Sequence, residues 1–363
     1  MKAWVLKRIG DISLQEAEVP APAADEVRIR VEAAGICGSD IPRIYETGAH
    51  RMPLIPGHEF SGVVEGIGKD VSSYWLGKRV AVFPKIACGK CGQCLNGLPD
   101  MCSDYDYVGS RRDGAFAKYV TAPMGNLLEL PDGVGFDVAA MMEPMAVAAN
   151  AVRTGCGRKG GLLAADKPVA VCGLGPIGLM AVMFLKEAGY GRVCVIGKRD
   201  AQKEKVKALG VPEEDYCNSA KEDAAEWLKE VTDGGAFAYF ECVGSNESIR
   251  YGIEGSAPGG RLILVGNPRS DMSLSRDAYW KILRNRLTVR GIWNSAFRQT
   301  DSMYREDDPD DWNYVLRKLT DGKIDSEKLI SHRFPLDKLD QGFSIMRDKT
   351  EDYTKVLMVK DGG

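Results

Sequence analysis

The chain has 363 residues, of which 44% are hydrophobic and 27% are charged, and its formal net charge is −3. This is the composition of a globular protein with room for two or three domains, and a nearly neutral chain without a basic block offers no support for nucleic-acid binding. We find no signal peptide and no apolar run long enough to span a bilayer, so we expect a cytoplasmic protein that does not bind membranes and keeps its thiols reduced.

The first third of the chain has the pattern of short β-strands. Apolar and polar residues alternate at residues 26–31, and further β-type patterns, broken by glycine and proline, follow at 62–68 and 79–83. We therefore expect an all-β module of barrel or rolled-sheet type. A cysteine-rich segment, at about residues 86–104, is inserted in this module as a loop.

Four cysteines in the inserted segment have the spacing of a zinc site. Steps of three, three and eight residues separate Cys88, Cys91, Cys94 and Cys102. Thiolates are soft ligands that suit zinc, and a closed set of four leaves the ion no position for a substrate. A reducing compartment disfavours the alternative, a pair of disulfides. We predict a structural zinc here, which by itself indicates nothing about a reaction.

A second, sparser set of possible metal ligands consists of Cys37, His58 and Glu59. Each residue alone has an ordinary interpretation, as a buried thiol, a core histidine or a surface acid. Their joint occurrence in a chain with only three histidines, close to the cysteine-rich segment, favours a metal site. Three protein ligands and one open position are typical of catalytic zinc, so we expect two zinc ions of different kinds.

Strand and helix patterns alternate from about residue 145 onwards. Helices are predicted at residues 145–152, 177–188 and 201–209, and strands at 168–172, 192–196, 237–242 and 261–265. Such alternation predicts right-handed βαβ units and a parallel sheet, in a domain that ends near residues 287–293. Acidic residues 301–311 are expected to form a loop or linker. The strand predicted at 355–359 should return to the first module, because a lone terminal strand has nothing to pair with.

A glycine-rich turn stands between the apolar strand at 168–172 and the helix after it. Gly173, Gly175 and Gly178 form a Gly-x-Gly-x-x-Gly string, in which Pro176 and Ile177 open the helix. A chance glycine-rich turn is the alternative in a chain with 41 glycines, but the strand before the string and the helix after it are those that a dinucleotide-binding turn requires. We predict that a pyrophosphate binds at this helix N-terminus.

The end of the second strand of this domain indicates which cofactor is preferred. An NAD site has an acidic residue there, which accepts a hydrogen bond from the ribose 2′-hydroxyl. This chain has Gly197, Lys198 and Arg199 instead, and two cations suit a 2′-phosphate. We therefore expect NADP(H) in preference to NAD(H). The alternative is that both cations are solvated at a helix start while NAD binds.

In these motifs and their order, the chain resembles the zinc-dependent medium-chain dehydrogenases over nearly its whole length, and the polyol branch most of all. The stretches that carry the resemblance surround Cys37, His58, the four-cysteine segment, Glu143 and Gly173. The resemblance implies an α/β protein with two domains. A GroES-like β-rich catalytic domain would comprise residues 1–145 and 294–363, and a Rossmann domain with a doubly wound parallel sheet would comprise residues 146–293.

The resemblance also implies roles around the open metal set. Cys37 and His58 would be ligands of the catalytic zinc. Glu59 and Glu143 stand where the polyol branch has acidic ligands, which bind directly or through water, and both possibilities stay open.

Ser39 occupies the position whose hydroxyl takes the alcohol proton, and Asp40 matches the carboxylate that orients the zinc histidine. Pro42 replaces a histidine that passes the proton to solvent in many relatives, so the proton must leave by another route. Further residues resemble those that contact the cofactor in the family: Cys242, Val243, Val265, Gly266, Ile292 and Trp293.

The resemblance implies the interconversion of a secondary alcohol of a polyol or polyol phosphate and the corresponding ketose. It also suggests a homodimer or homotetramer. Tentative substrate contacts are Arg43, His50, Arg111 and Arg112, since a guanidinium matches a phosphate group. The same arginines are also compatible with solvated surface charges. Two alternatives stay open: a dehydrogenase of simple secondary alcohols, and a non-catalytic zinc protein that binds NADP.

Overall fold

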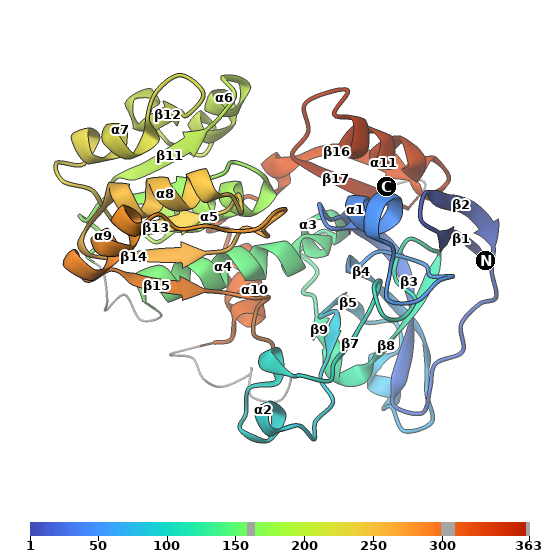
Figure 1. The fold of residues 1–363 in the computed structure, drawn as a ribbon. Coiled ribbons are helices and arrows are strands. Elements are labelled where there is room, and N and C mark those ends of the chain that lie inside the picture. Colours follow the sequence, from blue (N-terminus) through green and yellow to red (C-terminus); the bar gives the residue numbers. More distant parts are fainter. Residues whose placement is uncertain (158–163, 299–308, 361–363) are drawn as a thin grey trace. The chain divides into compact units, whose positions relative to one another are not determined.

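The computed structural model describes residues 1–157, 164–298 and 309–360, which form two compact units. Of these residues, the first unit holds 1–144, 295–298 and 312–360, and the second holds 145–157, 164–294 and 309–311. Figure 1 shows the elements of both units. Within the described residues, every helix is too short or too polar to cross a membrane.

A seven-stranded sheet is the centre of the first unit. Its strands follow the order β16-β17-β3-β4-β5-β9, and β8 pairs with β3. Their bounds are β3 Glu26–Ile36, β4 Glu59–Ile67, β5 Arg79–Val82, β8 Tyr119–Pro123, β9 Leu127–Glu129, β16 Ile330–Pro335 and β17 Lys355–Val359. The strands predicted in the first third of the sequence are thus present, and the terminal strand does return to the first unit, where it pairs with β3 and β16.

Shorter elements complete the first unit. They are the hairpin of β1 (Lys2–Arg8) and β2 (Asp11–Glu16), the helices α1 (Asp40–Pro42), α3 (Phe136–Ala140) and α11 (Leu339–Asp348), and most of α10 (Asp311–Thr320). The cysteine-rich lobe leaves the sheet after β5. It contains β6 (Lys85–Ile86), α2 (Gly92–Leu95), a short 3₁₀ helix at Pro99–Met101 and β7 (Asp106–Tyr107), and β6 pairs with β7 at its base.

The second unit is built on a six-stranded parallel sheet with the order β12-β11-β10-β13-β14-β15. The strand bounds are β10 Val169–Cys172, β11 Val193–Gly197, β12 Tyr216–Asn218, β13 Ala236–Glu241, β14 Ser256–Leu264 and β15 Thr288–Gly291. The strand order reverses beside β10, as in a doubly wound dinucleotide-binding fold. The predicted parallel sheet and βαβ pattern are therefore confirmed.

The helices of the second unit are α4 (Met142–Cys156, which begins in the first unit), α5 (Pro176–Glu187), α6 (Ala201–Lys207), α7 (Ala224–Val231), α8 (Asn246–Gly255) and α9 (Arg276–Arg284). Of these, α7, α8 and α9 were not predicted, since each has only eight to ten residues, too few for a helical period to stand out in the sequence. The predicted loop at 301–311 lies mostly outside the described residues. Its last residue, Asp311, begins α10 and forms a buried ion pair with Arg153 at 2.6 Å.

Candidate metal centres and dinucleotide site

The open metal set is assembled at the ends of two paired strands. Cys37 follows β3, and His58 and Glu59 stand at the start of β4, which runs antiparallel to β3 with Gly35 opposite Glu59. One possible ligand atom of each of the three residues lies within 4.8 Å of the others. A sulfur, an imidazole nitrogen and a carboxylate oxygen at this separation are a donor set that fits zinc.

Asp40 lies directly behind this cluster and is fully buried. Its carboxylate accepts a hydrogen bond from the Cys37 backbone N–H at 3.0 Å and another from Arg43, and it lies 3.5 Å from His58 Nδ1. Burial alone would raise the pKa of Asp40, but the charges of His58 and Arg43 outweigh burial and hold that pKa below its usual value. An ionised carboxylate therefore faces the ring of the candidate ligand, as in metal sites where a carboxylate orients a histidine.

The surroundings of His58 suit a metal ligand. It is buried, and its Nδ1 makes no hydrogen bond within the described structure, although the Asp40 carboxylate lies 3.5 Å away. Burial favours the neutral ring, but Asp40 and Cys37 raise the pKa of His58 well above its usual value. A metal ion would replace the proton that these anions attract, because histidine binds metals in its neutral form. The buried ring thus fits a ligand role.

Ser39 lies within reach of the same cluster. Its Oγ donates a hydrogen bond to Cys37 Sγ at 3.2 Å, and its own position precedes the first turn of α1. If Cys37 holds a metal ion, this hydroxyl would lie close to a substrate bound to that ion.

Glu143 lies outside the group of three but close to it. It stands in the first turn of α4, is buried, and accepts a hydrogen bond from the Tyr107 hydroxyl at 3.2 Å. Burial raises the pKa of Glu143 to about 7. The Tyr107 ring also packs edge-on against His58, with 5.8 Å between centroids. Tyr107 was missed in the sequence, where an isolated tyrosine in a short strand carries no signal.

Lys355, the first residue of β17, was also missed. Its ammonium group donates hydrogen bonds to Glu59 and to the Ile36 carbonyl, the latter at 3.2 Å, and its side chain is 2% exposed. Burial alone would lower the pKa of Lys355, but the charges of Glu59 and Cys37 outweigh burial and raise that pKa. A lysine at the start of an apolar strand was the available signal, but it is equally typical of a solvated strand end.

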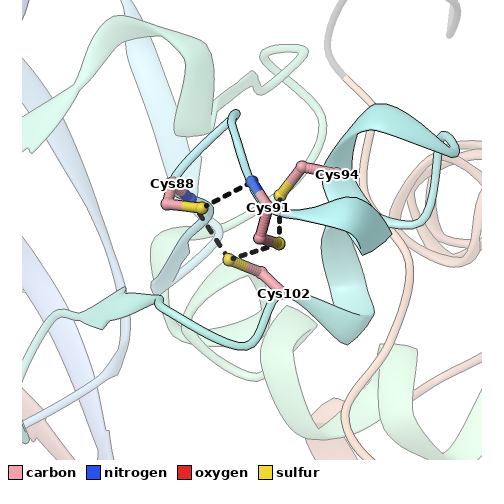
Figure 2. Close-up of side chains that lie close together, drawn as sticks. All are labelled: Cys88, Cys91, Cys94 and Cys102. Carbon is pink, nitrogen blue, oxygen red and sulfur yellow. Dashed lines mark hydrogen bonds between the residues drawn. The ribbon is translucent and has the colours of Figure 1, made fainter.

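The four-cysteine lobe is a closed thiolate cluster (Figure 2). Cys91 Sγ lies 3.5 Å from Cys94 Sγ and 3.8 Å from Cys102 Sγ. Four sulfurs at ~2.3 Å from one central ion would be ~3.8 Å apart, so these separations fit tetrahedral zinc. Backbone N–H groups of Cys94 and Ser103 lower the pKa of Cys91 to about 5, whereas loss of hydration and the neighbouring Cys91 raise the pKa of Cys94 to about 12. All four are free thiols.

The glycine-rich turn has the geometry that a dinucleotide requires. Gly173 follows β10 with φ +96°, and a Cβ there would lie 2.6 Å from Val243 Cγ2. A Cβ on Gly175 would meet nothing within 4 Å, which leaves room for a phosphate beside the backbone. A Cβ on Gly178 would collide with the Gly173 carbonyl, so this glycine lets α5 pack on the turn.

The other predicted cofactor residues meet at the same edge of the parallel sheet. Each pair follows the carboxyl end of a strand: Cys242 and Val243 after β13, Val265 and Gly266 after β14, and Ile292 and Trp293 after β15. Glu241, which was not predicted, shapes this edge, because its buried carboxylate accepts 2.8 Å hydrogen bonds from the N–H groups of Val243 and Gly244. Ligands of open parallel sheets bind at this edge.

Lys198 and Arg199 follow β11 and are both exposed. Lys198 Nζ pairs with Glu247 at 2.9 Å across the surface. Gln202, which was not predicted, accepts hydrogen bonds from the backbone N–H groups of both residues at 3.0 and 3.2 Å. The cations therefore stand on a fixed backbone, and an exposed ion pair such as the one at Lys198 is weak enough for a phosphate to displace.

The four tentative substrate residues have different surroundings. Arg43 pairs with the buried Asp40, and Arg112 pairs with Glu26 at 2.6 Å. The Arg111 guanidinium stacks on the Tyr105 ring at 4.5 Å from its centroid, and His50 is exposed on a loop. Two of these arginines are thus already paired with carboxylates. A substrate role stays a prediction for all four.

Comparison with known proteins identifies relatives of both units. Residues 23–132 match the family described as alcohol dehydrogenase GroES-like domain, and residues 176–322 match the zinc-binding dehydrogenases. The chain is 32% identical to galactitol 1-phosphate 5-dehydrogenase of Escherichia coli K12, with 92% of each chain covered. It is 33% identical to L-threonine 3-dehydrogenase of Bacillus subtilis, with 96% of this chain and 95% of that one covered. The crystal structure of galactitol-1-phosphate dehydrogenase from Escherichia coli superimposes with a TM-score of 0.88, at 30% identity over 99% of this chain and all of the other.

Proposed function

The chain belongs to the zinc-dependent alcohol and polyol dehydrogenases, which act on CH–OH donors, and we propose that it interconverts a secondary alcohol of a polyol or polyol phosphate and the corresponding ketose with NADP(H). The observation that carries this proposal is the cluster of the half-buried Cys37 with the buried His58 and Glu59, with Asp40 behind it. Galactitol 1-phosphate and sorbitol-like polyols are the substrates we propose first.

We assign each residue of the cluster a separate role in the reaction. Cys37, His58 and a carboxylate would hold the catalytic zinc, which when bound polarises the substrate oxygen and lowers its pKa. Ser39 Oγ, beside Cys37 Sγ, would accept the alcohol proton while its own hydroxyl proton passes to water. The Asp40 carboxylate, 3.5 Å from Nδ1, orients the imidazole ring of His58. A nicotinamide cofactor held at the Gly173 turn would supply the hydride acceptor.

We propose NADP(H) as the preferred cofactor because no acidic side chain occupies the end of β11, where Gly197 stands before two cations. Replacing both Lys198 and Arg199 by alanine should weaken NADPH binding by about 10- to 100-fold, the worth of one or two hydrogen bonds to a charged group, and leave NADH binding nearly unchanged. Cofactor dissociation constants measured by fluorescence check this, with Lys221→Ala as a neighbouring control, since Lys221 pairs with Asp200. Equal weakening of both cofactors would discard the 2′-phosphate interpretation.

The substrate class is tested by a screen that also tests the alternatives. Purified protein is assayed with both cofactors on free polyols, polyol phosphates, L-threonine and simple secondary alcohols, and its zinc content is measured. We expect two zinc ions per chain and the highest kcat/KM on a polyol or its phosphate. Activity only on simple alcohols would move the function there, and a single zinc with no activity would favour a non-catalytic NADP-binding protein.

We also propose that the chain forms a homodimer or homotetramer in the cytoplasm. Large apolar side chains around α9 and the edge strand β15 are exposed, which is unusual for a monomer: Tyr279, Trp280, Leu283, Val289 and Trp293. Sedimentation velocity would show the oligomeric state. Ten free cysteines fit a reducing compartment.

The domain limits predicted from the sequence stay a prediction, which limited proteolysis would test.

A further inference from the structure

Glu59, a candidate metal ligand, is paired with a buried lysine from a distant part of the chain. Lys355 and Glu59 are separated by 296 residues, and their side chains are 2% and 1% exposed. The pairing follows from sheet register: Val356 of β17 stands opposite Ile36 of β3, and Gly35 of β3 stands opposite Glu59 of β4. Three adjacent strands thus bring the ammonium group to the carboxylate beside Cys37.

The ion pair depends on the glycine between its partners. A Cβ on Gly35 would collide with Glu59 Oε2 and would lie 2.8 Å from Lys355 Cε. The lysine is further held by the Ile36 carbonyl, which accepts from Nζ at 3.2 Å, and its own carbonyl accepts from Ser331 Oγ at 3.0 Å. The ammonium group therefore has one fixed position, in contact with Oε2 of Glu59.

A cation in this position limits what the carboxylate can do at a metal. Oε2 already accepts a hydrogen bond from the Lys355 ammonium group, which weakens this oxygen as a metal donor and leaves Oε1 as the better donor for an ion that Cys37 and His58 would hold. We propose that Lys355 is a positioning residue that keeps Glu59 a one-oxygen, displaceable ligand, so that substrate oxygen can take its place. This inference rests on the proposed catalytic zinc.

Removal of the lysine charge should tighten the metal site rather than loosen it. In Lys355→Met, the buried Glu59 carboxylate has lost the cation that pairs with it. An unpaired buried charge is costly, so the carboxylate should bind the metal ion more strongly. Both of its oxygens are then available to the ion. Zinc loss from the Cys37 site to a chromogenic chelator should slow by about 10- to 100-fold, the range typical of groups that contact metal ligands. The visible spectrum of the Co²⁺-substituted protein should change with the coordination number, and kcat should fall.

Controls separate charge from packing. Lys355→Arg keeps the cation and should stay close to the native protein, and Lys360→Met removes an exposed lysine that pairs with Glu32 just after the same strand. Release of the lobe zinc serves as an internal reference and should not change. If Lys355→Met does not fold, Lys355→Gln repeats the test, because it retains a donor for the Ile36 carbonyl.

The Glu59→Gln background tests whether the effect passes through Glu59. There the second change, Lys355→Met, should alter neither zinc release nor the Co²⁺ spectrum, because the charged carboxylate is already absent. Unchanged or faster zinc release in Lys355→Met, or the same response with Glu59→Gln, would overturn the proposal. Failure of the proposed function looks different: the protein would then hold no zinc that depends on Cys37.

Discussion

The two candidate metal centres of the first unit are built in different ways. In the lobe, all four ligands come from one short segment, and the sulfurs contact one another and nearby backbone N–H groups. In the open cluster, the candidate ligands come from the ends of two strands, and a second layer of Asp40, Arg43 and Lys355 surrounds them. The closed centre draws all its ligands from one segment. The candidate ligands of the open centre are surrounded by charged side chains from other parts of the chain. In our proposal, these surrounding charges are what would leave one coordination position of the ion open to substrate.

The largest effect should follow loss of the open-site thiolate. Cys37→Ala should remove one of the two zinc ions and lower kcat/KM by about 10³-fold or more, because several kcal/mol of charge stabilisation in the transition state disappear. Metal analysis and steady-state kinetics check this. Cys156→Ala, a buried cysteine of α4 outside both clusters, is the matched control. If Cys37→Ala keeps two zinc ions, Cys37 is not a zinc ligand and the open cluster is not a metal centre.

A smaller effect is expected at the carboxylate behind the histidine. Asp40→Asn keeps the shape of the side chain and removes its charge, so zinc affinity at the open site should fall by about 10- to 100-fold while the lobe zinc is retained. Competition with a chelator of known affinity measures both sites in one sample. Asp106→Asn, in the strand at the base of the lobe, is a control for charge removal. An equal loss at both sites would indicate general destabilisation instead of an orienting role.

The smallest effect on catalysis should come from the lobe. Cys91→Ala should release the lobe zinc and make the segment sensitive to protease, because a structural zinc site supplies folding energy to its own ligand loop. The kcat of protein that keeps the open-site zinc should fall by less than about tenfold, since no lobe sulfur belongs to that cluster. Gln93→Ala, inside the lobe, is the control. Complete inactivation with the open-site zinc still bound would show that the centres are coupled.

The sequence anticipated local arrangements well. Four cysteines within fifteen residues, or three glycines within six, can meet only in a few ways, so their spacing predicted the closed zinc lobe and the dinucleotide turn. The parallel sheet followed from the alternation of strand and helix patterns. Helices α7, α8 and α9 were missed, because eight to ten residues are too few for a helical period to stand out in the sequence.

The sequence by itself determined that this chain has two zinc-type ligand sets, a dinucleotide turn and the family to which they belong, because those signals lie in short segments. Only the tertiary structure decided what surrounds the open set. Arg43 faces Asp40, and Lys355 reaches Glu59 across 296 residues. The physical reason is that these contacts are set by the register of β17, β3 and β4, where a shift of one residue would turn each side chain to the other face of the sheet.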